Sequence, residues 1–159
     1  MTSYDETRLE PGNQYAANYV REVTARYIGP RRKGLTISGP GDAACFMRGL
    51  LRDEVREHFL ALYLNAAHHV VSFSLVSLGT ATSAPVSAGV IFQGALLVGA
   101  SALIVGHNHT SGELQPSPED VDVTKRLKQA GELLRVPLLD HVLFSETDYV
   151  SFHEQGILA

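Results

Sequence analysis

The stretch "IVGHNHTSGELQPSPEDV", residues 104–121, leaves an apolar run, passes two histidines and a loop of small residues, and then begins a helix. The apolar run "ALIVGH", residues 102–107, predicts a short buried strand. Successive side chains of a strand point to opposite faces, so His107 and His109 should present their imidazoles on the same side, about 7 Å apart. That placement suits two ligands of one metal ion.

A third ligand is needed, because catalytic zinc sites use three protein ligands and leave one position for water. Asp120 is the best-placed candidate. A competing interpretation is that Ser117, Pro118 and Asp120 only start a helix, with serine as the N-cap, proline at the first helical position and aspartate three residues after the cap. Both interpretations can hold at once, because a carboxylate in the first turn stays ionised and can still offer an oxygen to a cation.

Outward from this segment, strand and helix patterns are interleaved along the chain. Strands are expected at residues 57–65, 68–79, 102–107, 136–145 and 148–154. Helices are expected at residues 13–28, 43–53 (capped by Asp42), 88–99 and 117–134. The first of these strands is apolar on both faces, as in a central sheet position. The pattern predicts an α/β fold with a sheet flanked by helices.

The 159 residues suit one compact domain preceded by an arm. Residues 1–34 are interpreted as an N-terminal helical arm and connector, because Gly29-Pro30 and Gly39-Pro40-Gly41 interrupt regular structure. The compact domain is expected at residues 35–159. A tyrosine stripe in the arm should serve packing or association with another copy of the chain, so a homo-oligomer is possible.

Composition narrows the partners. The formal net charge of −4 does not favour nucleic-acid binding, which draws on clustered lysine and arginine. The single cysteine, Cys45, excludes an internal disulfide and a multi-thiolate metal site, and it is expected to be a small core residue. The chain shows no secretory signal and no apolar run long enough for a bilayer, so we expect a cytoplasmic protein without membrane contact.

The spacing His107-x-His109, seven residues, Ser117, two residues, Asp120 resembles the JAMM signature of the JAB/MPN metallopeptidases. The wider pattern "GHNHTSGELQPSPEDV…LLDHVLF" resembles the RadC branch in particular, and the resemblance extends from about Leu35 to the C-terminus. It implies a mixed β-sheet flanked by helices, in the JAB/MPN architecture that cytidine deaminases share.

The resemblance also implies roles for individual residues. His107, His109 and Asp120 match the metal ligands of one Zn²⁺ per chain, and Ser117 matches the serine that hydrogen-bonds the oxyanion. Glu57, in "REHFLALYLN", matches the glutamate that holds the water and moves its proton. From the residues alone, Glu54 or Glu113 could supply the base instead. We prefer Glu57, because a strand holds a base more rigidly than a loop does.

The implied function is a zinc-dependent hydrolase that cleaves a peptide or isopeptide bond in a peptide or protein substrate. Two alternatives remain: an accessory protein of DNA repair, which the low basic charge does not favour, and a non-catalytic scaffold of the MPN type, whose members typically lack the ligands. A nucleobase deaminase is excluded, because one cysteine cannot supply its Pro-Cys-x-x-Cys motif.

Several residues depart from the family pattern or stand outside the motif. Thr110 replaces a proline that the family often has, and residues 87–90, Ser-Ala-Gly-Val, replace a His-Pro-Arg-Glu string of RadC relatives. Asp140 or His141 could orient a metal-bound histidine, and for His141 a buried structural or supporting role is favoured over direct ligation. His68 and His69 are expected in a solvated turn.

Overall fold

A five-stranded mixed sheet forms the centre of the protein, in the order β2-β1-β3-β4-β5. The computed structural model describes residues 34–51, 53, 55–79 and 86–158, so the helix predicted at residues 13–28 lies outside the described residues. The strands are β1 (Glu57–Leu64), β2 (Val70–Gly79), β3 (Ala102–Asn108), β4 (Leu138–Phe144) and β5 (Tyr149–Ser151). The helices are α1 (Pro40–Arg48), α2 (Ala88–Leu97) and α3 (Pro118–Leu134).

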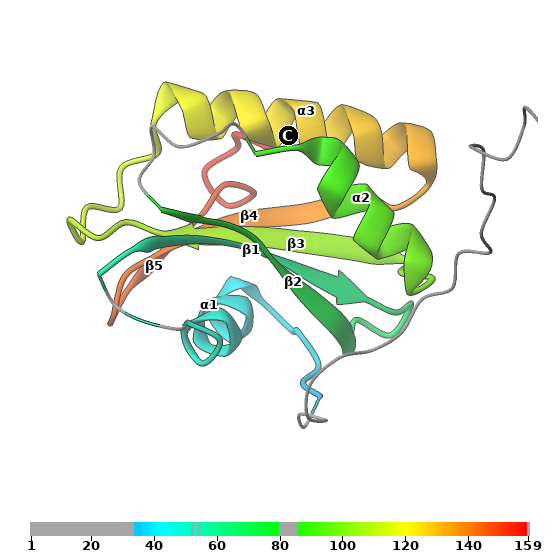
Figure 1. Ribbon diagram of the computed structural model, residues 1–159, viewed down its shortest axis with the longest axis horizontal. Coiled ribbons are helices and arrows are strands. Elements are labelled where there is room, and N and C mark those ends of the chain that lie inside the picture. Colours follow the sequence, from blue (N-terminus) through cyan, green and yellow to red (C-terminus); the bar gives the residue numbers. More distant parts are fainter. Residues whose placement is uncertain (1–33, 52, 54, 80–85, 159) are drawn as a thin grey trace, which may run out of the picture.

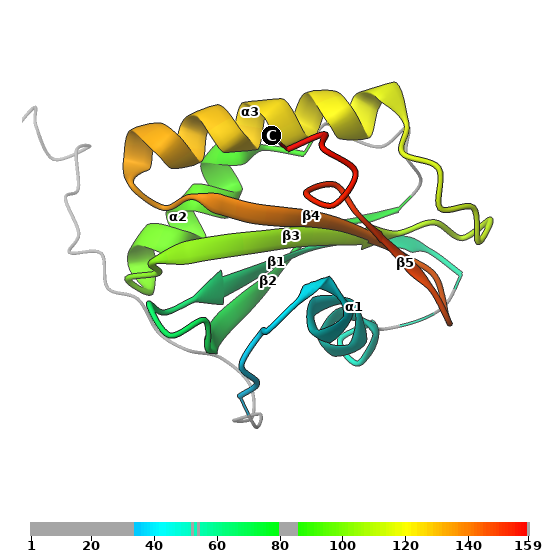
Figure 2. The ribbon, with the colours of Figure 1, turned by 180° about the vertical axis from the view of Figure 1, so that it is seen from behind.

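The helices lie on both faces of the sheet, α2 and α3 on one face and α1 on the other (Figures 1 and 2). β1 pairs antiparallel with β2 and β3, β3 pairs parallel with β4, and β4 pairs antiparallel with β5. The predicted α/β class with a mixed, helix-flanked sheet is therefore confirmed. None of the helices in the described ranges has the length and apolarity needed to cross a membrane.

The parallel pair β3 and β4 fixes the position of α3. Parallel neighbours cannot be joined by a tight turn, so the chain leaves β3, crosses over the sheet as α3 and returns in the same direction as β4. The carboxyl end of β3 and the amino end of α3 therefore meet at one edge of the sheet, joined by residues 109–117. This is the segment with which the sequence analysis began.

β3 is buried along its whole length, and its two faces serve different cores. Leu103 and Val105 pack with the residues under α2 and α3. Ile104 packs with the residues around α1. Because side chains alternate along a strand, His107 continues the row of Leu103 and Val105 and points toward the α3 side. The apolar strand thus carries a polar ring into the space below α3.

β1 has the central position that its apolar character predicts, with β2 on one side and β3 on the other. Its residues are buried from His58 to Leu64, and only the first residue, Glu57, is partly exposed. Phe59 lies opposite His107 in the β1–β3 register. The strand therefore starts at the same edge of the sheet at which β3 ends.

The first helix differs from the prediction. It runs from Pro40 to Arg48 rather than over residues 43–53, and its N-cap is Gly39 instead of Asp42. The carboxylate of Asp42 accepts a hydrogen bond from the backbone N–H of Ser38 (2.8 Å). Proline at the first helical position fits this start, because its fixed φ is already helical and its missing N–H is not needed there.

Two smaller expectations have opposite outcomes. Cys45 is exposed on α1, so its assignment to the core was wrong. His68 and His69 are both exposed in the turn between β1 and β2, as expected, and His68 adopts a left-handed backbone with φ 58°.

Candidate metal centre

Two histidines and an aspartate meet at the edge where β3 ends and α3 begins. His107 is the penultimate residue of β3, His109 follows the strand directly, and Asp120 lies in the first turn of α3. Their ligand atoms all lie within 4.8 Å of one another, and this is the group in the described part of the chain that could hold a metal ion. His107 is buried, whereas His109 and Asp120 are partly exposed.

The distances within the group match the size of a zinc site. His107 Nε2 lies 3.1 Å from His109 Nε2 and 3.1 Å from an oxygen of Asp120. His109 Nε2 lies 3.8 Å from the other Asp120 oxygen. Ligands bound at about 2.0 to 2.2 Å in tetrahedral geometry lie about 3.3 to 3.6 Å from one another. The three side chains can therefore reach one ion with only small shifts.

In both imidazoles the Nδ1 atom is hydrogen-bonded outside the group, so the Nε2 atoms of His107 and His109 face each other and Asp120. His107 Nδ1 lies 2.9 Å from Nε2 of His141, and His109 Nδ1 lies 2.9 Å from the backbone carbonyl of Glu113. A carbonyl can only accept, so His109 Nδ1 carries the proton. In a neutral imidazole the other nitrogen, Nε2, then has a free lone pair for a cation.

Asp120 serves the helix cap and faces the histidines at once. Its Oδ2 accepts hydrogen bonds from the N–H and the hydroxyl of Ser117 (2.8 and 2.7 Å), while its Oδ1 faces His107. Burial raises the pKa of the carboxyl, but the hydrogen bonds and charge of His107 and the hydrogen bonds of Ser117 outweigh it and hold the pKa well below its usual value. The carboxylate is thus kept ionised, as a metal ligand must be.

The predicted capping box of α3 is present in full. The Ser117 hydroxyl accepts from the N–H of Asp120 (3.1 Å) and donates to the carboxylate of the same residue. A hydroxyl has one proton to give, so the Ser117 proton is directed at Asp120 in this structure. The Asp120 carboxylate therefore lies between the Ser117 hydroxyl and the two imidazoles.

Glu57 begins β1 at this edge but is not one of the three grouped residues. The β1–β3 pairing ends at Phe59 and His107, so Glu57 and His109 each lie two residues beyond its end. Of the alternative bases, Glu113 has an exposed position in the loop, and Glu54 lies outside the described residues.

Asn108 holds the start of β1 against the end of β3. Its side-chain oxygen accepts from the N–H of His58 (2.7 Å), and its amide nitrogen donates to the carbonyl of Arg56 (3.1 Å). These two bonds flank Glu57 on both sides. The sequence analysis did not single out Asn108, although its position between the two histidines was a signal.

Behind His107 lies a second layer of polar side chains. His141, from β4, is fully buried, and burial first and the charge of His107 second hold its pKa well below the usual value. The expected supporting role therefore falls to His141. Asp140 instead accepts from Ser151 and from the N–H of His153, which fastens the C-terminal turn. Thr124 completes the layer and was not recognised from the sequence.

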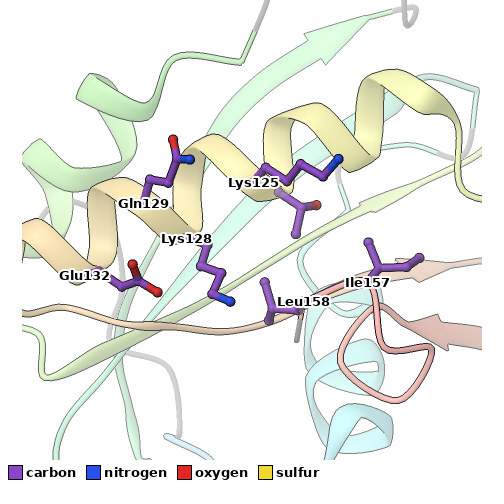
Figure 3. Close-up of a pocket in the computed structure, with 7 residues that line it drawn as sticks. Lys125, Lys128, Gln129, Glu132, Ile157 and Leu158 are labelled. Carbon is purple, nitrogen blue, oxygen red and sulfur yellow. The ribbon is translucent and has the colours of Figure 1, made fainter.

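Two pockets lie near the group, and one of them borders it. A cavity of about 760 Å³ is lined by three segments: the end of α1 and the residues after it (Arg48, Leu51, Asp53), residues 108–112, and residues 144–147. A smaller one, of about 310 Å³, lies between α3 and the C-terminal segment, where Lys128 points toward Leu158 (Figure 3). His109 forms part of the wall of the first.

A mixed α/β sheet that brings two histidines and an aspartate together at one edge defines a class of protein, an α/β domain with a candidate mononuclear metal site. The particular family follows from comparison with known proteins. The chain belongs to the RadC family, because the model of the RadC-like JAB domain matches residues 37–157.

Curated relatives have only general names. The chain is 38% identical over 137 residues to a UPF0758 protein of Chlorobium chlorochromatii, covering 86% of this chain and 62% of the relative. It is 41% identical over 123 residues to UPF0758 protein ABC2615 of Shouchella clausii, covering 77% and 54%. The chain thus spans less than two thirds of the length of these relatives.

Proposed function

We propose that the domain is a metal-dependent hydrolase of the JAMM type that holds one Zn²⁺ and cleaves a peptide or isopeptide bond. The observation that carries this proposal is the convergence of two imidazole Nε2 atoms and one carboxylate within 4.8 Å, with both Nδ1 atoms already hydrogen-bonded. Two nitrogens and one oxygen form the three-ligand set of catalytic zinc sites. When bound, the ion supplies an acidified water and polarises the substrate carbonyl.

Glu57 is the proposed proton carrier. A partly exposed carboxylate at the start of a buried strand is rigid at its backbone and can still reach solvent. It lies two residues beyond the last β1–β3 pair, Phe59 and His107, which supports a position near His109. From there Glu57 would take a proton from water and deliver it to the leaving amine, the two steps of general base and general acid catalysis.

Ser117 is the proposed donor to the oxyanion of the tetrahedral intermediate. Its hydroxyl proton is given to Asp120 in this structure, so this role requires the hydroxyl to rotate from the carboxylate toward the substrate. The N–H of Ser117 can keep its own bond to Asp120 during such a rotation. The substrate would be an extended peptide or protein segment that enters along the pocket beside His109.

The decisive experiment combines metal analysis with cleavage of an unbiased peptide library. Purified protein should contain about one zinc per chain, and cleavage should stop when a chelator is added and return with zinc. Glu57→Gln should abolish cleavage while keeping the metal. Retention of full metal by Asp120→Ala, or cleavage that resists the chelator, would contradict the proposal.

The same preparation tests the two alternatives. Zinc at full occupancy without cleavage of any library peptide would favour the scaffold role with a structural ion. Tight, salt-sensitive binding of a labelled DNA duplex would favour a nucleic-acid accessory, because phosphate contacts make affinity fall steeply with salt. With a formal net charge of −4, we expect only weak binding.

A further inference from the structure

A closed circuit of polar contacts runs behind the candidate metal centre. His107 Nδ1 meets His141 Nε2 at 2.9 Å, and His141 Nδ1 meets the Thr124 hydroxyl at 2.7 Å. The Thr124 hydroxyl reaches the backbone carbonyl of Asp120 at 2.6 Å, and an Asp120 carboxylate oxygen returns to His107 Nε2 at 3.1 Å. The circuit therefore joins β3, β4 and α3, and it begins and ends on two of the three ligands.

The proton positions in this circuit follow from the chemistry of its members. The backbone carbonyl of Asp120 can only accept, so the Thr124 hydroxyl gives its single proton to that carbonyl. The Thr124 oxygen can then only accept from His141, which puts a proton on His141 Nδ1. A fully buried imidazole is neutral, so His141 Nε2 is an acceptor and receives the proton on His107 Nδ1.

We propose that His141 and Thr124 are positioning residues that hold a proton on His107 Nδ1, so that Nε2, which faces Asp120 and His109, is the ring nitrogen left to bind the ion. The inference rests on the proposed metal site and extends it to two residues outside the ligand motif. Most metal-bound histidines are held by a carboxylate, a carbonyl or water. Here a second imidazole does this, and a threonine sets the tautomer of that imidazole.

The circuit has a mechanical consequence as well. Thr124 stands one helical turn after Asp120, and its hydroxyl bonds the carbonyl four residues earlier. The same hydroxyl is tied through His141 to the strand that carries His107. The first turns of α3, and with them Asp120, are thus held at a set distance from the histidine that shares the ion.

Two substitutions at Thr124 separate its hydroxyl from its packing. Thr124→Val keeps the shape of the fully buried side chain and removes the hydroxyl, whereas Thr124→Ser keeps the hydroxyl and removes the methyl. His141→Leu removes the acceptor for His107 directly. Phe152→Leu is the control, because the Phe152 ring stacks on His141 at 4.4 Å but takes no part in the circuit.

The first measurement is zinc affinity, by competition with a chromophoric chelator at neutral pH. We expect Thr124→Val and His141→Leu to weaken zinc binding by about 10- to 100-fold, the usual effect of losing a partner of a metal-bound histidine, and Thr124→Ser and Phe152→Leu to stay within about threefold. Circular dichroism identifies any variant that fails to fold. Because valine is isosteric with threonine, that variant keeps the test valid if His141→Leu does not fold.

The second measurement needs no metal. Long-range ¹H–¹⁵N correlation spectra of ¹⁵N-histidine-labelled, metal-free protein should show His107 protonated at Nδ1 in the wild type and Thr124→Ser. A mixture of tautomers should appear in Thr124→Val. Unchanged zinc affinity in folded Thr124→Val and His141→Leu, or equal losses with valine and serine, would overturn the inference.

The two measurements separate this inference from the proposed function. Wild-type protein that binds no zinc but shows the Nδ1 tautomer would refute the metal site and support the positioning roles. Wild-type protein that binds zinc, but whose His107 lacks the Nδ1 proton wholly or in part in the metal-free spectrum, would refute the positioning roles and support the metal site.

Discussion

Single residues at this site each belong to two interactions, and Asp120 is the clearest example. One carboxylate oxygen closes the helix cap with Ser117, and the other faces His107. The two functions do not compete, because a carboxylate has two oxygens and about four acceptor positions. The sequence pattern of a helix cap is thus also the pattern of a ligand set, and only the histidine pair distinguishes the two.

Removing the cap should cost stability without removing the metal. Ser117→Ala should lower the free energy of unfolding of metal-free protein by about 1 kcal/mol, the usual value for a lost N-cap. Zinc binding should persist, because the Oδ1 atom of Asp120 still faces His107. Urea denaturation and zinc competition measure the two effects.

Ser87 offers a matched control for this prediction. It occupies the N-cap of α2 but makes no side-chain cap hydrogen bond. Ser87→Ala should therefore change the free energy of unfolding much less than Ser117→Ala does. Equal effects at both positions would show that the capping bonds of Ser117 contribute nothing beyond those of an ordinary serine.

Tyr63 should make stability fall at alkaline pH. Burial raises the pKa of its hydroxyl above the ordinary 10.0, and the hydroxyl bonds the Ile91 carbonyl (3.0 Å). A raised pKa means that the native state holds the proton more tightly than the unfolded chain does. The stability that the protonated hydroxyl contributes is therefore complete below pH 10.0 and is lost as the pH rises above it. Because Tyr63→Phe lacks the hydrogen bond to Ile91, it should be less stable at neutral pH by about 1 kcal/mol.

Urea denaturation between about pH 8 and about pH 11 tests this expectation. The stability of wild-type protein should fall more steeply with pH than that of Tyr63→Phe, so the two curves should converge at high pH. Parallel curves would mean that the native hydroxyl titrates as it does in the unfolded chain.

At the scale of elements, β3 is packed closely against α1 and β4 at the residue that precedes His107. A methyl group on Gly106, the residue before His107, would stand 2.7 Å from the carbonyl of Val142 and would also meet the sulfur of Met47. Gly106→Ala should lower the free energy of unfolding by about 1 to 3 kcal/mol, as overpacking of a core does. Zinc affinity should fall with it, because the shifted backbone carries His107.

Gly89 in α2 has room for the same change. Its added methyl would have only the Ser87 hydroxyl nearby, at 3.6 Å. Gly89→Ala should raise the free energy of unfolding by about 0.5 to 1 kcal/mol, because alanine favours the helix. Thermal denaturation of both variants measures these changes. A stabilising effect of Gly106→Ala would show that α1 and β4 shift to accommodate the methyl group at little cost in free energy.

The sequence predicted the elements better than their ends. The periods of apolar residues located β1, β3, α2 and α3 within about two residues, as long, clear patterns allow. The start of α1 was missed, because Gly39-Pro40-Gly41 was interpreted only as a break in regular structure. Proline is also the preferred residue of the first helical turn, and only the packing of the following residues against the sheet shows which role applies.

The three grouped residues of the site could be predicted from the sequence, whereas the contact between Thr124 and His141 could not. Alternation along a strand and the start of a helix are local patterns, so the sequence alone predicted that His107, His109 and Asp120 form one group. Thr124 and His141 are 17 positions apart, and their contact depends on how α3 lies over β4. No local pattern contains that information.

At the scale of the whole molecule, the crossover from β3 through α3 to β4 is what makes the site. It joins the ends of a strand and a helix at one edge and sets His141 of the neighbouring parallel strand behind His107. On the other side of β3, β1 begins with Glu57 at the same edge. The three candidate ligands lie within 14 residues of sequence, but the side chains that contact them come from separate elements.

Zinc should therefore stabilise the whole fold, because the ion would clamp β3 to α3. A ligand that binds only the native state adds about 2.7 kcal/mol to the free energy of unfolding when its concentration is 100 times its dissociation constant.

Asp120→Ala should lose this increment. Asp122→Ala should keep it, because Asp122 is an exposed carboxylate outside the grouped residues. Thermal denaturation with and without zinc measures the increment. Any binding of zinc to the seven histidines of the unfolded chain would lower the observed gain. An equal zinc effect in wild type and Asp120→Ala would mean that the ion binds elsewhere.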